Sequence, residues 1–153
     1  MASEQVKTVL DNTRQYHARI GEHFATLASR CNQPRASMLL DYLSGHERDL
    51  AAAIDRIEED TESKVLDTWV QSSEASTHLV SQLEREIDPP PDASFEDLVG
   101  WALRMDNRAL QVYEDLALRS EPAWLREVFQ QMYRMEQQEE KLVAVQTLRG
   151  MDL

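Results

Sequence analysis

Apolar residues recur at alternating steps of three and four along the first 59 residues, which is the pattern of amphipathic helices. The pattern predicts a first helix from a capping Ser3 to about Arg30, and a second from about Pro34 to Glu59. Two polar residues complete the apolar stripe of the first helix at its centre. That stripe consists of Val6, Leu10, Thr13, His17, Ile20, Phe24 and Leu27.

The same pattern returns near the C-terminus and predicts a second pair of helices. Ser94 followed by Asp97 is a variant of the capping box and marks the start of the third helix, which extends to residue 119. The fourth helix is expected from about Pro122 to Leu148, with Gly150 as its stop. Its expected inward positions are Leu125, Val128, Phe129, Met132, Met135, Glu136, Glu139, Leu142 and Val143.

Residues 60–93 connect the two pairs and have a weaker pattern. Apolar residues at Val65, Leu66, Trp69 and Val70, and again between residues 79 and 87, predict short helices. The prolines at positions 89–91 stop any helix there. This connection is long enough to cross the length of a helical bundle.

The second pair of helices repeats the first in sequence. Phe24-Ala-Thr-Leu-Ala-Ser-Arg30 returns as Tyr113-Glu-Asp-Leu-Ala-Leu-Arg119, and the same offset aligns the apolar positions on either side. A helical hairpin built twice predicts an all-α, pseudo-symmetric four-helix bundle with a long, partly helical crossover. We expect residues 4–30 with 34–59 to superimpose on residues 93–119 with 122–148. The expected organisation is a single domain over residues 1–153, with hairpins at 4–59 and 94–148 and a crossover at 60–93.

Composition restricts the classes of partner. A formal net charge of −12 argues against nucleic acid and against an anionic membrane surface. No apolar run approaches the ~20 residues needed to cross a bilayer, and the N-terminus lacks the features of a signal peptide. Cys31 is the only cysteine, which excludes an internal disulfide and a thiolate metal cage. These features predict a cytoplasmic protein.

Charged and polar side chains at the centre of the apolar stripes are the candidate functional residues. The repeat aligns His17 with Asp106 and Glu47 with Glu136, and Glu139 follows Glu136 by one turn. Burying these groups is costly unless they are paired or bind a metal. Carboxylates with one imidazole suit iron, manganese or zinc. We therefore expect His17, Glu47, Asp106, Glu136 and Glu139 to converge, with His46 and Asp49 as a surface or network pair beside them.

On these residues the chain resembles the ferritin-like superfamily, in particular the rubrerythrin-type bundles. The resemblance covers all four predicted helices and includes the aromatic-x-x-Leu-Ala segment late in the odd helices. It implies a ferritin-like fold and a di-iron centre to which each odd helix gives a carboxylate and each even helix a Glu-x-x-His pair. Carried over by position, Asp106 is the odd-helix carboxylate of the second half, and Glu47 and Glu136 are the glutamates of the two pairs.

The chain departs from that pattern at three positions. Leu50 and Glu139 stand where the histidines of the two pairs are required, and His17 replaces the odd-helix carboxylate of the first half. A consensus di-iron centre is therefore absent. Two alternatives remain: a divergent metal site, or a buried network of histidine and carboxylates without metal. Whether the protein is an enzyme stays open.

Tryptophans in segments whose inward stripe is already filled suggest an interaction surface. Trp69 and Trp101 are the two such residues, and large aromatic side chains outside a bundle are commonly covered by a partner. We expect a homodimer on this basis. The alternative function is accordingly a non-catalytic helical interaction protein that has lost its metal site, with an unidentified protein partner.

Overall fold

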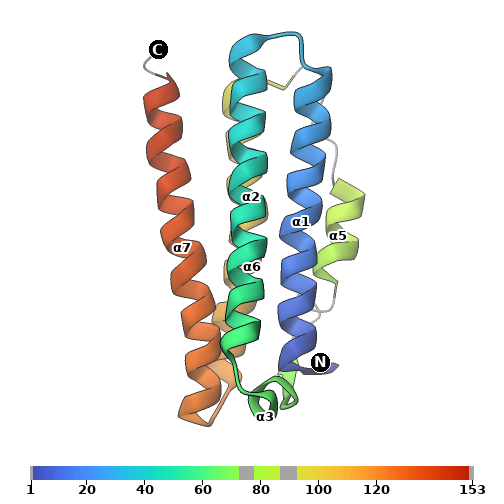
Figure 1. The fold of residues 1–153 in the computed structure, drawn as a ribbon, viewed down its shortest axis with the longest axis vertical. Coiled ribbons are helices and arrows are strands. Elements are labelled where there is room, and N and C mark those ends of the chain that lie inside the picture. Colours follow the sequence, from blue (N-terminus) through green and yellow to red (C-terminus); the bar gives the residue numbers. More distant parts are fainter. Residues whose placement is uncertain (1, 73–77, 87–92, 152–153) are drawn as a thin grey trace.

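The computed structural model describes residues 2–72, 78–86 and 93–151, and within them the chain is mostly helical. Four long helices run side by side: α1 (Val6–Arg30), α2 (Pro34–Asp60), α6 (Phe95–Arg119) and α7 (Ala123–Met151) (Figure 1). α1 pairs with α2 and α6 pairs with α7 as two long hairpins. The predicted pairs of helices are confirmed.

The helix bounds follow the sequence repeat. α1 and α6 are both 25 residues long, and their first and last residues are displaced by the offset that separates Phe24 from Tyr113. The first residues of α2 and α7 are displaced by that same offset. Phe24 and Tyr113 are both fully buried in the core. The helix bounds and the burial of these two residues therefore agree with the sequence repeat.

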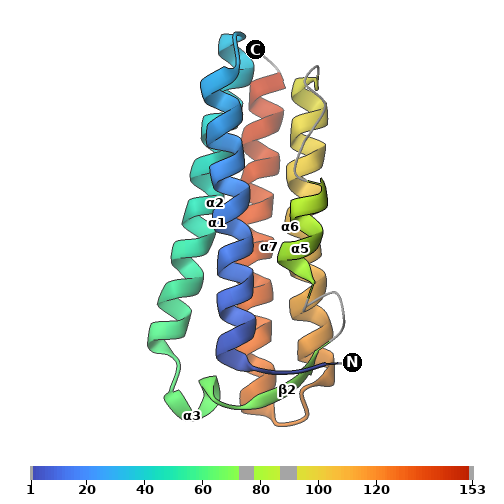
Figure 2. The same ribbon diagram turned by 90° about the vertical axis from the view of Figure 1, so that its right-hand side faces the viewer.

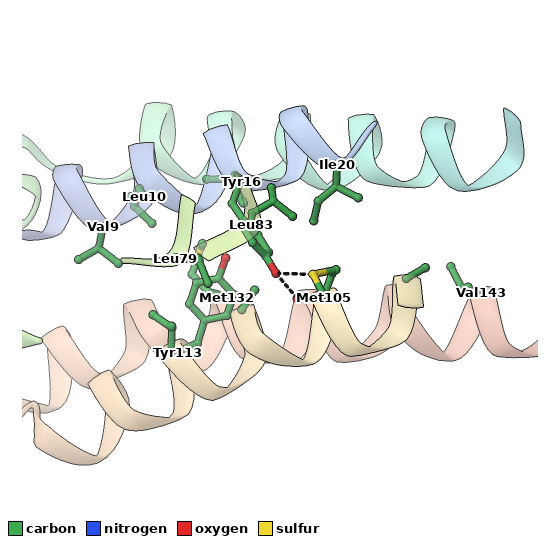
Figure 3. Close-up of a cluster of buried hydrophobic side chains, with 14 of the residues drawn as sticks. Val9, Leu10, Tyr16, Ile20, Leu79, Leu83, Met105, Tyr113, Met132 and Val143 are labelled. Atoms are coloured by element: carbon green, nitrogen blue, oxygen red, sulfur yellow. Dashed lines mark hydrogen bonds between the residues drawn. The ribbon is translucent and has the colours of Figure 1, made fainter. Parts of the chain in front are cut away.

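The middle region connects the lower end of α2 to the upper end of α6 (Figure 2). It contains α3 (Ser63–Leu66), β2 (Trp69–Ser72) and α5 (Leu79–Glu86). α5 packs on α1 and α6 through the buried side chains of Leu79 and Leu83 (Figure 3). The helix expected in residues 79–87 is present up to Glu86; Ile87 and the prolines at 89–91 lie outside the described residues.

A small two-stranded sheet was missed by the sequence pattern. β1 (Ala2–Gln5) pairs antiparallel with β2, and Glu4 lies opposite Val70. Ser3 is therefore a strand residue and not the predicted cap of α1, which begins at Val6 without a side-chain cap. The helix expected at Val65 and Leu66 is present as α3, but Trp69 and Val70 are strand residues, so the helix expected at those two positions is wrong. Strand pairing decides this because four residues carry too little periodicity to distinguish helix from strand.

The start of α6 agrees with its predicted capping box. The Ser94 hydroxyl accepts a hydrogen bond from the Asp97 amide at 3.1 Å, and the Asp97 carboxylate accepts one from the Ser94 amide at 3.2 Å. We expect Ser94→Ala to lower the free energy of unfolding by about 1 kcal/mol, because one amide at the helix start loses its acceptor. Urea denaturation followed by circular dichroism measures this change. Ser81→Ala is the control, because Ser81 lies on an exposed turn of α5 and caps no long helix; equal losses in the two variants would contradict the prediction.

α7 differs from its prediction at two points. The helix continues through Gly150 to Met151, so the stop expected at Gly150 is wrong. Leu142 is exposed rather than inward. Within the described part of the chain, no helix is long and apolar enough to span a membrane.

Equivalent positions of the repeat meet at the centre of the structure. The Tyr16 hydroxyl on α1 donates a hydrogen bond to the backbone oxygen of its repeat counterpart Met105 on α6, at 2.7 Å (Figure 3). In a chain built from two related halves, equivalent residues contact each other only near the axis that relates those halves. The next pair of counterparts, His17 and Asp106, lies at the same level, so the polar residues of the two stripes meet at this axis.

Candidate metal centre

Each of the four long helices contributes a buried polar side chain to one cluster. α1 provides His17, α2 provides Glu47, α6 provides Asp106 and α7 provides Glu136. These four residues are named here the central cluster. They are at most 2% exposed, so their charges are removed from water and have to be balanced within the bundle.

His17 lies between the two glutamates. Its Nδ1 atom is 2.6 Å from Glu47 Oε2, and its Nε2 atom is 2.6 Å from Glu136 Oε1. Burial disfavours the charged ring, but the charges of Glu136 and Glu47 outweigh this penalty and raise the pKa of His17 well above its usual value. In the metal-free protein His17 is therefore an imidazolium that donates to both carboxyl groups.

Glu47 and Asp106 are neighbouring carboxyl groups in the central cluster, and each affects the pKa of the other. Burial and the neighbouring charge of Asp106 raise the pKa of Glu47 well above its usual range. Burial also acts against the Asp106 anion, but the hydrogen bond from His46 and the interactions with Glu47 and His17 lower its pKa overall. The pKa values of these two neighbouring carboxyl groups are therefore shifted in opposite directions.

Glu136 is held by two donors at the same oxygen. The Tyr113 hydroxyl donates to Glu136 Oε1 at 2.7 Å, beside the contact from His17. Burial, together with the charge of Glu136, raises the pKa of Tyr113 well above its usual value, so the phenol keeps its proton. Tyr113 fixes this glutamate in a hydrogen-bonded position.

Several carboxylate oxygens of the central cluster can still accept a hydrogen bond or a cation. Glu136 Oε2 is buried and has no hydrogen-bond partner. Glu47 Oε1 and Asp106 Oδ1 are buried as well and have no hydrogen-bond partner. Unpaired buried oxygens cost about 1–3 kcal/mol each. A cation is the partner that such a set of oxygens accepts.

Three of the donors also lie close enough together that they could hold a metal ion. His17, Glu47 and Asp106 each offer one ligand atom, and these three atoms lie within 4.8 Å of one another. Imidazole with carboxylates is a suitable set for iron, manganese or zinc. The residues present therefore fit a divalent metal ion.

Of the five candidate residues, the structure brings His17, Glu47, Asp106 and Glu136 together. Glu139 lies at the edge: its side chain is 36% exposed and its Oε2 atom is 3.7 Å from His46 Nδ1. One helical turn moves Glu139 away from the level of His17, toward the surface between α2 and α7. It does not converge on the central cluster as predicted.

His46 and Tyr113 also belong to the site, and the sequence pattern gave both residues too little weight. His46 is buried and its Nε2 atom is 3.2 Å from Asp106 Oδ2, whereas Asp49 is exposed, so the two are not a pair. Steps of three from Leu43 and four to Leu50 already place His46 on the inward stripe. The sequence pattern treated Tyr113 as an apolar core residue. Its hydroxyl, which the repeat counterpart Phe24 lacks, contacts Glu136.

One of the tryptophans expected at an interaction surface is internal. Trp101 is buried, packs edge-to-face on Phe24 at 5.3 Å between ring centroids, and donates from Nε1 to the Glu86 backbone oxygen at 3.3 Å. α5 covers this face of α6, which explains why Trp101 is buried and not exposed as expected. Trp69 is exposed, as expected.

No protein-family model, curated protein or solved structure matches this chain.

Proposed function

We propose that this protein is a divergent, single-domain ferritin-like bundle that binds a divalent metal ion in its central cluster. The order of hairpin, long crossover and hairpin supports the fold assignment, since a bundle with one long crossover has this arrangement. The observation that carries the metal is the set of buried ligand atoms of His17, Glu47 and Asp106 within 4.8 Å of one another. Glu136, with its unpaired Oε2, is a fourth ligand candidate.

The surrounding residues hold the ligands in place. Tyr113 positions Glu136 through its hydroxyl, and His46 positions Asp106 through Nε2. Buried donors of this kind fix ligand orientation and tune metal affinity. When bound, iron or manganese would supply redox chemistry and zinc would supply Lewis acidity. The buried side chains around the cluster, among them Tyr16 and Met105, limit the access of water.

Elemental analysis and thermal melts test this proposal. We expect protein purified without chelator to carry iron, manganese or zinc. Adding the ion at a free concentration of about 100 times Kd stabilises a protein by about 2.7 kcal/mol, which raises Tm by about 5–10 °C for a chain of this size. The Glu136→Ala variant should lose most of that rise, because one ligand candidate is removed.

Glu114→Ala is the control, since it removes a carboxylate from an exposed position on the neighbouring helix. This variant should keep the full rise in Tm. Equal rises in the wild type and in Glu136→Ala would place any metal elsewhere. No rise in the wild type would refute metal binding altogether.

The second candidate is a non-catalytic interaction bundle that has lost its metal, as a homodimer or with another protein. It is favoured by the two contacts of His17, because an imidazolium with both nitrogens on carboxylates already balances charge without an ion. Trp69 and Trp124 remain more than half exposed and would supply the contact surface. Sedimentation at micromolar concentration tests the homodimer, and a monomer would count against it.

A further inference from the structure

The central cluster is fully enclosed on one side and connected to the surface on the other. On the side of α6 and α7, Glu136 is covered by Tyr113, which is itself fully buried. On the side of α2, Asp106 contacts His46, and His46 in turn faces Glu139. The exposed fraction of the side chain rises along this second direction, from 3% for Asp106 and 4% for His46 to 36% for Glu139.

His46 has the geometry of a connecting group. Its Nε2 atom is 3.2 Å from Asp106 Oδ2, and its Nδ1 atom is 3.7 Å from Glu139 Oε2. The outer contact is longer than a hydrogen bond, in contrast to the 2.6 Å contacts of His17. Because it is loose, Glu139 can exchange this contact for a cation without breaking a strong bond.

The surface next to His46 is negative. Glu139 and Glu140 are both partly exposed neighbours on α7. Burial raises the pKa of Glu140, and the charges of Asp106 and Glu136 add to this rise. Partly exposed carboxylates concentrate cations locally and accelerate their association.

We infer that Glu139 and His46 form an outer station between α2 and α7, through which a divalent metal ion passes between solvent and the central cluster. The ion is held first by Glu139 and the Nδ1 atom of His46. It is then passed to Asp106, whose other oxygen, Oδ1, is 3.7 Å from His17 Nδ1. Asp106 thus connects the two histidines. This inference rests on the proposed metal-binding function and adds the route by which the ion is exchanged.

Stopped-flow mixing of Zn(II) with the full chain, read by competition with a chromogenic zinc chelator, tests the route. Glu139→Gln should slow both association and dissociation by about threefold to tenfold, because the station lowers the barrier in both directions. The equilibrium Kd, measured by calorimetry, should stay within about twofold for the same reason. His46→Gln should slow both rates as well.

Glu114→Gln is the matched control, because it removes the same charge from an exposed position outside the route. Its rates should equal those of the wild type. The route would be overturned if Glu139→Gln bound and released Zn(II) at the wild-type rates, or if its Kd changed through the dissociation rate alone. Either result would leave the central site intact. Absence of Zn(II) binding to the wild type would instead refute the proposed function itself.

Discussion

Replacing His17 with leucine is expected to lower the free energy of unfolding of the metal-free protein by about 3–5 kcal/mol, because breaking a buried ion pair leaves its partners uncompensated. His17 is the residue that contacts both Glu47 and Glu136, each at 2.6 Å. Leucine fills similar space and offers no donor to either. For a chain of this size the loss corresponds to a fall in Tm on the order of 10 °C.

Urea denaturation followed by circular dichroism measures this loss. His78→Leu makes the same change at an exposed position, and should stay within about 0.5 kcal/mol of the wild type. A His17→Leu protein as stable as this control would mean that the glutamates are balanced without the imidazole. That result would contradict the charge arrangement described for the central cluster.

Asp106→Asn is expected to weaken metal binding strongly while changing metal-free stability little. Asparagine keeps an acceptor for His46 but removes the charge that raises the pKa of Glu47. Less repulsion remains in the metal-free state, so its free energy of unfolding should fall by no more than about 1 kcal/mol, the net worth of one hydrogen bond, or rise. The affinity for Zn(II) should fall by more than about 100-fold. Loss of a residue that only orients a ligand costs up to about 100-fold, and here the ligand itself is lost.

Calorimetric titration with Zn(II) and urea denaturation without metal measure the two effects. Asp115→Asn on the same helix is the control, since Asp115 pairs with Arg119 and is not part of the central cluster. It should leave the Zn(II) affinity unchanged. If Asp106→Asn weakened stability and affinity in proportion, Asp106 would be a structural residue and not a ligand.

The fold followed from the sequence wherever long periodic segments repeat. The stripe of α1 and its counterpart in α6 fixed the inward faces, because a helix can bury only the residues that recur at steps of three and four. Pro34 and the Ser94–Asp97 capping box marked helix starts correctly. Short elements gave no comparable signal, which is why the pairing of β1 with β2 was missed.

The site was predictable to the extent that the repeat superimposes polar residues. His17, Glu47, Asp106 and Glu136 occupy stripe positions at one level of the bundle, and packing the two hairpins brings them together. Burial of their charges in a helical core made them candidates for chemistry before any contact was known.

Tertiary packing alone decided which neighbours complete that cluster. The distance from α7 to α2 determines that Glu139 reaches His46 and not His17. The direction of the Tyr113 ring determines that its hydroxyl meets Glu136, and the position of α5 determines that Trp101 is covered. A sequence pattern specifies which face of a helix is buried, but distances between side chains on different helices depend on how far apart and at what level those helices pack.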